Sequence, residues 1–304
     1  MSSAVPLLKS EPVYLRNRLF ALIHLLRLEQ WSKNAFVLAG LVFRRAWTDT
    51  HLSLHVGAAV LGFSLVASGT YIINDFVDRD LDRKHEKKSK RPLAAGTVSL
   101  PEALICCLLL LSTGEAVGFA ASPAVAGILG IYVILTLAYS LWLKRLVLVD
   151  VFVLAGLYML RLFAGTSGVG ISPSGWLITC GGTFSLFLAL GKRRAELRAS
   201  MKPAAEFRPV LGSYTVSFLD RAMSIAAACA IIMYSLYTMS PETVHLHATG
   251  RLIYTTPFVM FGVFRYMLLS EHLGTGSDPA RELFVDWPLM ACAGAWLAAV
   301  MLFV

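Results

Sequence analysis

The sequence contains few charged residues, and its cysteines form no pattern that indicates a disulfide or a zinc site. Asp, Glu, Lys and Arg make up 15% of the 304 residues, against roughly 25% in an average soluble domain. The five cysteines lie in apolar segments, without a CxxC pair or a histidine at ligand spacing. The chain also lacks a low-complexity linker and a polar domain. These absences argue against a soluble protein and against a disulfide framework.

Long apolar segments dominate what is present. Apolar residues make up 57% of the chain, and stretches of about 20 such residues are typical of membrane helices. We predict an all-α multi-pass membrane protein, residues 1–304 forming one integral membrane domain, with about nine spans near 21–43, 52–74, 102–121, 123–143, 148–169, 174–191, 219–239, 252–270 and 286–304. The first span could begin as an interfacial helix, because polar residues interrupt it.

The net charge of +8 reflects how Lys and Arg are placed between the predicted spans. This placement fits membrane topology and anionic ligands better than nucleic acid, so no nucleic-acid partner is expected. With a cytoplasmic N-terminus, the 27 Lys and Arg residues lie in cytoplasmic loops or the N-terminal region, except Arg44, Arg45, Arg161, Arg221 and Arg251. We therefore predict a cytoplasmic N-terminus and a cytoplasmic active face.

Acidic residues collect where the second predicted span ends, in the sequence NDFVDRDLD. A continuous helix would place Asn74, Asp78 and Asp82 on one face, since they are spaced four and eight residues apart, with Asp75 beside them, three and seven residues before Asp78 and Asp82. Carboxylate and amide oxygens are ligands that suit Mg²⁺, so we predict that these four residues hold this ion. The alternative is a solvated helix end whose acids pair with nearby Arg and Lys.

A basic run follows, with six Lys or Arg between Arg83 and Arg91. Basic residues beside a magnesium site suggest a phosphorylated or pyrophosphorylated substrate. The candidate substrate-binding residues in this run are Arg83, His85, Lys87 and Arg91. The alternative is that the run only enforces the orientation in the membrane.

Charged residues farther along the chain add candidates. Lys192 and Arg193 lie one helical turn from Glu196, so a face with two cations and an acid could clamp a phosphate; the alternative is a surface salt-bridged turn. Arg161 lies about 16 Å along a helix from Asp150. A guanidinium that deep in a membrane helix must face a polar cavity or an acidic partner. The alternative is a structural ion pair between helices. The remaining candidates are Lys33 and Asn34, which could instead belong to an interfacial anchor, and Lys144.

The motif Asn74-Asp75-x-x-Asp78-x-x-x-Asp82 on the second of nine spans resembles the first aspartate motif of the UbiA superfamily of intramembrane prenyltransferases. The usual second aspartate motif is replaced by GKRRAEL, which begins at Gly191. With QWSKN, KRPLAAG, YSLWLK and FRYMLL, this segment resembles the phosphoribosyltransferase branch of the superfamily. Glu86 departs from that branch, whose pattern tends to have proline there.

The resemblance implies a helical bundle around a central cavity that opens to the cytoplasmic face, in a bacterial inner membrane. It also implies transfer of phosphoribose from phosphoribosyl pyrophosphate to a polyprenyl phosphate such as decaprenyl phosphate, with release of pyrophosphate, for cell-wall precursor synthesis. Asp75, Asp78 and Asp82 would then bind Mg²⁺ on the leaving group, while Lys192 and Arg193 would bind the lipid phosphate. Oligomer formation is compatible with the sequence.

Two other functions stay open from the sequence. An aromatic prenyltransferase that uses a polyprenyl pyrophosphate shares the fold and the first motif, but it leaves GKRRAEL unexplained. A lipid-phosphate transporter is disfavoured because the chain shows no inverted halves with matching broken spans. A requirement for Mg²⁺ and release of pyrophosphate would distinguish an enzyme from a transporter.

Overall fold

The fold is helical, as predicted. A computed structural model describes residues 20–84, 88–199, 209–272 and 285–304, and this part of the chain contains no β-strand. The longer helices are α3 (Thr50–Val77), α6 (Leu100–Ala121), α7 (Pro123–Leu141), α8 (Val149–Ala164), α9 (Gly175–Ala199), α10 (Val216–Met239), α12 (Thr256–His272) and α14 (Trp287–Phe303). Among the shorter helices are η1 (Leu28–Leu38), α2 (Ala39–Phe43), α4 (Arg79–Arg83), α5 (Pro92–Ala95), η4 (Leu143–Arg145), η7 (Pro209–Ser213) and α11 (Pro241–His247).

Six helical segments in the described ranges are long and apolar enough to cross a membrane. Their outward side chains are large and apolar, as in Leu108 at 66%, Ile134 at 69% and Ile225 at 66% exposure, which fits a lipid environment. The predicted count of nine spans is not confirmed. The first predicted span contains the 3₁₀ helix η1 and the short α2, the last is the 17-residue α14, and α9 ends in charged residues.

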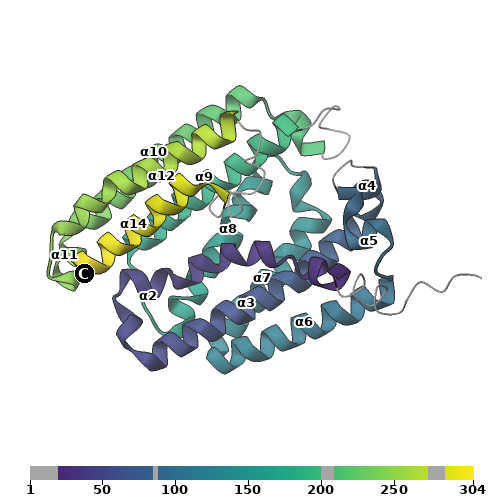
Figure 1. Cartoon of the computed structure of the whole chain (residues 1–304), viewed down its shortest axis with the longest axis horizontal. Helices are drawn as coiled ribbons and strands as arrows, with labels where there is room; N and C mark the ends of the chain where they lie inside the picture. Colours follow the sequence, from purple (N-terminus) through teal and green to yellow (C-terminus); the bar gives the residue numbers. More distant parts are fainter. Residues whose placement is uncertain (1–19, 85–87, 200–208, 273–284) are drawn as a thin grey trace, which may run out of the picture.

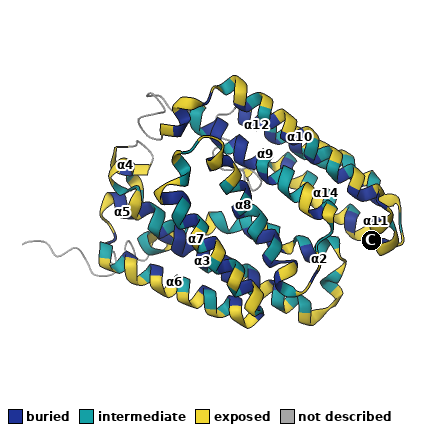
Figure 2. Ribbon diagram, turned by 180° about the vertical axis from the view of Figure 1, so that it is seen from behind, coloured by how far each residue is buried: buried dark blue, intermediate teal, exposed yellow. Residues whose placement is uncertain are grey.

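Glycine allows α3 and α6 to pack closely. A Cβ atom added at Gly62 would lie 3.0 Å from the carbonyl oxygen of Gly114, and one at Gly114 would lie 2.7 Å from the Val66 side chain. Small residues at such positions let membrane helices approach until their backbones touch. The pairing leaves one long side of α6 exposed, as Figure 2 shows, and it directs the C-terminal end of α3 toward α4 and α5.

The two ends of the molecule differ in what they contain. Figure 1 shows α4 and α5 at one end, and α11 with the C-terminus at the opposite end. One buried core joins α3, α7 and η1, and a second joins α8, α9, α10 and α12. The acidic motif, at the C-terminal end of α3, therefore lies at the end that carries α4 and α5 (Figure 1).

The helix η1 runs along α3 and is unusual in length. It has 11 residues, whereas 3₁₀ helices longer than 3–4 residues are uncommon. Hydrogen bonds attach it to α3, since Trp31 donates to the Ser68 hydroxyl over 3.0 Å and Asn34 donates to the Ser64 hydroxyl over 2.8 Å. These contacts compensate for the weaker backbone geometry of a 3₁₀ helix.

Candidate active site

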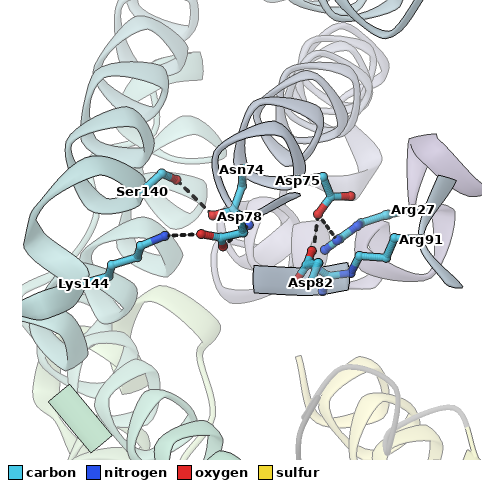
Figure 3. Close-up of polar contacts among 8 residues, drawn as sticks. All are labelled: Arg27, Asn74, Asp75, Asp78, Asp82, Arg91, Ser140 and Lys144. Atoms are coloured by element: carbon cyan, nitrogen blue, oxygen red, sulfur yellow. Dashed lines mark hydrogen bonds and ion pairs between the residues drawn. The ribbon is translucent and has the colours of Figure 1, made fainter. Parts of the chain in front are cut away.

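The acidic motif is divided by a break in the helix at Asp78. Helix α3 ends at Val77 and α4 begins at Arg79, while Asp78 has φ −91° and ψ 2°, outside the α-helical region. The sequence suggested one continuous helical face. Instead, Figure 3 shows two groups: Asp75 and Asp82 lie beside two arginines, whereas Asn74 and Asp78 lie beside Lys144. The motif therefore offers two adjoining sets of oxygen atoms.

Two arginines hold the first set. The Arg91 guanidinium donates to Asp82 over 2.6 Å and to Asp75 over 3.1 Å, and Arg27 also pairs with Asp75 (Figure 3). The carboxylate side chains are only 3% and 5% exposed for Asp75 and Asp82. Burial raises the pKa of Asp82 above its ordinary value, although the neighbouring Arg91 opposes this shift.

Arg27 was not identified from the sequence. It lies 48 residues before Asp75 in the chain, so only the packing of η1 against α3 brings them together. Its backbone adopts the left-handed conformation, with φ 50°, and its guanidinium lies 5.3 Å from the centre of the Tyr71 ring. An arginine inside the first apolar run was the available signal, because such a residue requires a partner.

A lysine holds the second set. Lys144, from η4, donates to Asp78 over 2.6 Å, and Asn74 donates to the other oxygen of that carboxylate over 3.2 Å. Ser140 in turn donates to the side-chain amide oxygen of Asn74 over 3.1 Å (Figure 3). The Asp78 side chain is 24% exposed and Lys144 is 13% exposed, so this pair is more accessible than Asp75.

The chemistry of these oxygen atoms fits Mg²⁺, which binds one or two carboxylates and completes its shell with water and substrate phosphates. Among the described residues, no group of three or more His, Cys, Asp or Glu side chains converges as a preformed metal cage. Instead, Arg27, Arg91 and Lys144 neutralise the carboxylates. A metal ion bound to these carboxylates would therefore displace part of these cations.

A second charged cluster surrounds Arg193 of α9. Its side chain is 0% exposed and lies 3.5 Å from Asp150 and 2.6 Å from Glu196. Arg193 also donates to the Tyr139 hydroxyl over 3.4 Å. Tyr214 donates to Asp150 over 2.7 Å, and both burial and this hydrogen bond raise the pKa of the Tyr214 hydroxyl, so that it remains a donor. The geometry makes Arg193 the centre of a closed network.

Consecutive cations at the end of α9 point in different directions. Lys192 is half-buried, whereas Arg193 faces Asp150 inside the bundle. Arg194 pairs with Asp220 of α10 and donates to the Ser270 carbonyl oxygen over 2.7 Å. Of the two cations predicted to clamp a phosphate, Lys192 is thus the accessible one.

Arg161 lies deep in the bundle, away from the aspartates. It donates to Asn34 over 2.8 Å and to the Tyr132 hydroxyl over 3.0 Å, and no Asp or Glu among the described residues pairs with it. Asn34 bonds Ser64, which precedes Asn74 by ten residues, or about 15 Å along a helix. The alternative of an ion pair is thus not found within the described ranges, and Arg161 instead fixes η1.

The remaining candidates lie at the edge of the site or outside the described ranges. Arg83 is 46% exposed and donates to the Ala94 carbonyl oxygen over 3.3 Å, which attaches α4 to α5. Lys33 donates to Gln30 within η1. His85 and Lys87 lie outside the described residues. The structure therefore brings together Asn74, Asp75, Asp78, Asp82, Arg91 and Lys144 from the predicted set, with Arg27 added.

Comparisons with known proteins identify the family of the chain. The sequence profile of the UbiA prenyltransferase family matches residues 34–203. A decaprenyl-phosphate phosphoribosyltransferase of Corynebacterium glutamicum is 30% identical over 295 residues, which cover 94% of this chain and 87% of that protein. The uncharacterized protein y4nM of Sinorhizobium fredii is 35% identical over 258 residues, which cover 84% of this chain but only 50% of that protein's length.

A solved structure shares the fold. The UbiA homolog from Archaeoglobus fulgidus, bound to GPP and Mg²⁺, aligns with a TM-score of 0.70 and 17% identity over 93% of this chain and 99% of that one. The family match, the relatives and the long apolar helices together define an integral membrane transferase. The chain belongs to the UbiA prenyltransferase family.

Proposed function

We propose that the protein transfers 5-phosphoribose from phosphoribosyl pyrophosphate to a polyprenyl phosphate, releasing pyrophosphate. The observation that carries this proposal is the composition of the site: one acidic motif interleaved with Arg27, Arg91 and Lys144, and a basic Lys192 where a second acidic motif would lie. The Corynebacterium relative, named decaprenyl-phosphate phosphoribosyltransferase, supports the same reaction.

The donor would bind at the divided motif. Asn74, Asp75, Asp78 and Asp82 would hold Mg²⁺, which when bound supplies charge neutralisation to the pyrophosphate leaving group. Arg27 and Arg91, displaced in part from their carboxylates, donate to the diphosphate oxygens and orient them. Lys144 stabilises the charge that develops on the leaving group as the bond between it and the anomeric carbon breaks.

The acceptor supplies its own nucleophile. A phosphate oxygen of the lipid forms the new bond to the anomeric carbon, and the leaving pyrophosphate takes the bonding electron pair, so no strong general base is needed. Lys192 would contact the lipid phosphate, while Arg193, Asp150 and Glu196 hold the end of α9 that presents it. The apolar faces of the helices accommodate the isoprenoid tail.

The proposed location of the active site at a membrane surface follows from the two substrates. One is water-soluble and the other is a lipid, so an active face at a membrane surface gives access to both. We propose that residues 1–304 form one catalytic domain in a bacterial inner membrane, with the N-terminus and this face cytoplasmic, because the Lys and Arg residues concentrate on that side.

The test uses purified protein in detergent with labelled phosphoribosyl pyrophosphate, decaprenyl phosphate and Mg²⁺. We expect an acid-labile, labelled phosphoribosyl lipid that disappears when EDTA is added. The competing function is aromatic prenylation, since the Archaeoglobus structure with this fold is bound to GPP. Prenylation of 4-hydroxybenzoate from a prenyl pyrophosphate, without transfer of phosphoribose, would overturn the proposal in favour of that function.

A further inference from the structure

Leu148, immediately before α8, has a backbone conformation that is unfavourable for a residue with a Cβ atom. Its φ is 65° and its ψ is −39°, in a region normally reserved for glycine. Burial of the side chain does not offset this strain, because Leu148 is 43% exposed, and its neighbours Val147 and Val149 are 45% and 37% exposed. Other contacts must therefore hold the turn.

A single hydroxyl group bonds both the backbone of the strained residue and a side chain two residues later. The Leu148 backbone N–H donates to the Tyr214 hydroxyl over 2.7 Å, and that hydroxyl donates to the Asp150 carboxylate over 2.7 Å. Tyr214 is only 5% exposed, and Asp150 is completely buried beside Arg193. The strained turn is thus attached to the Arg193 cluster through Tyr214.

The same turn carries the lysine of the aspartate site. Helix α7 ends where the Trp142 N–H donates to the Ala138 carbonyl oxygen over 2.9 Å, and Leu148 begins the next helix. Lys144 lies between these two points and reaches Asp78 over 2.6 Å. The position of its backbone depends on both ends of the turn being fixed.

We propose that Tyr214 is a positioning residue that keeps Leu148 in its strained conformation and thereby places Lys144 on Asp78. The structural role of Tyr214 does not depend on the proposed function. Only its consequence does, namely that Lys144 is placed to neutralise charge on the leaving group. Tyr214 itself contacts neither the aspartates of the acidic motif nor, in this scheme, a substrate. Asp150 and Arg193 act with it as the fixed support.

The proposal predicts a change in the accessibility of Lys144, which can be measured without any substrate. In Tyr214→Phe, the hydroxyl is lost and the turn relaxes, so amine acetylation of Lys144, followed by mass spectrometry, should become roughly tenfold faster. Exposed Lys84 serves as the internal reference. The matched control is Tyr234→Phe, which removes a buried hydroxyl of α10 that bonds Thr255 and Trp296.

The decisive variant is the double substitution Tyr214→Phe with Leu148→Gly. Glycine adopts a positive φ without strain, so the turn no longer needs the hydroxyl, and protection of Lys144 should return toward the wild-type level. In the transfer assay, Tyr214→Phe should lower kcat/KM for phosphoribosyl pyrophosphate about tenfold, and Leu148→Gly should restore part of it. A residue that only fills space would show no such rescue.

The possible outcomes distinguish failure of the positioning role of Tyr214 from failure of the proposed transferase function. Unchanged labelling of Lys144 in Tyr214→Phe, or a double variant labelled as fast as the single one, would overturn the positioning role. If Tyr214→Phe yields no folded protein, recovery of folding by Leu148→Gly supports the role, and failure to recover contradicts it. If labelling follows the prediction but wild-type protein transfers no phosphoribose, the proposed function fails while the role of Tyr214 stands.

Discussion

Two charged clusters at the same end of the molecule differ in how their charges are held. At the aspartate motif, Arg91 is 25% exposed and Asp78 is 24% exposed. Around Arg193, both Arg193 and Asp150 are 0% exposed. Partly exposed cations can exchange for a ligand, whereas a buried pair is destabilised strongly when either partner is removed. The first cluster is therefore suited to binding, and the second to support.

The largest effect is expected from Asp78→Asn, which removes a charged ligand but keeps the shape of the side chain. We predict at least ~100-fold lower kcat/KM for phosphoribosyl pyrophosphate, because metal and electrostatic stabilisation of the leaving group would be lost. Steady-state kinetics measure this change. The matched control is Asp80→Asn, since that carboxylate is 89% exposed and should be dispensable. Near-normal activity of Asp78→Asn would contradict the metal assignment.

The contrast between neighbours on α9 gives the next prediction. Arg193→Gln leaves the buried Asp150 without its cation, which should lower stability by about 3 kcal/mol and reduce the Tm by several degrees. Lys192→Gln should leave the Tm nearly unchanged and raise KM for the lipid phosphate roughly tenfold. Thermal unfolding and kinetics of both variants test this division. The reverse pattern, with Arg193→Gln stable and defective only in KM, would show that Arg193 contacts the substrate.

A smaller effect is expected at the arginine that bridges Asp75 and Asp82. Arg91→Gln should lower kcat/KM for phosphoribosyl pyrophosphate about tenfold, because a guanidinium donor to the diphosphate is lost. Arg83→Gln is the control, as this side chain is 46% exposed and pairs with the exposed Asp80. Its activity should stay within about twofold of wild type. Equal losses in both variants would mean that only the overall positive charge matters.

The smallest effect concerns pH and Asp82. Burial raises the pKa of this carboxyl above its ordinary value of 3.8, so its contribution to folding stability is present below that pH and is lost as the pH rises. Asp82→Asn has no carboxyl to titrate at this position, so its folding stability does not fall for this reason as the pH rises. The Tm of the variant relative to wild type, measured without Mg²⁺, should therefore increase as the pH is raised from below 3.8 toward neutrality. A difference that falls with rising pH would show that Arg91 outweighs the effect of burial.

The aspartate site could be predicted from the sequence because its main residues are close in the chain. Hard oxygen ligands at the end of an apolar run indicate a cation site whatever the rest of the fold. Arg27 and Lys144 reach it from 48 and 66 residues away. Only tertiary packing determines these contacts, so the sequence does not indicate Arg27 and does not show which acid Lys144 contacts.

The second cluster was harder to predict for a geometric reason. Consecutive residues on a helix point about 100° apart, so a run such as Lys192-Arg193-Arg194 does not show which cation faces inward. The structure shows Arg193 facing Asp150 and Arg194 facing Asp220. Tyr214 carries no motif at all, and its role depends on the strained conformation of Leu148, which the sequence does not show.

The most direct test of the difference between the clusters is binding of Mn²⁺, a substitute for Mg²⁺ at oxygen ligands, followed by electron paramagnetic resonance with and without phosphoribosyl pyrophosphate. Wild-type protein should bind Mn²⁺ more tightly when the diphosphate is present. Asp78→Asn should lose this binding, and folded Arg193→Gln should keep it. Retention by Asp78→Asn, or loss in folded Arg193→Gln, would contradict the assignment of binding to the aspartates and of support to the Arg193 cluster.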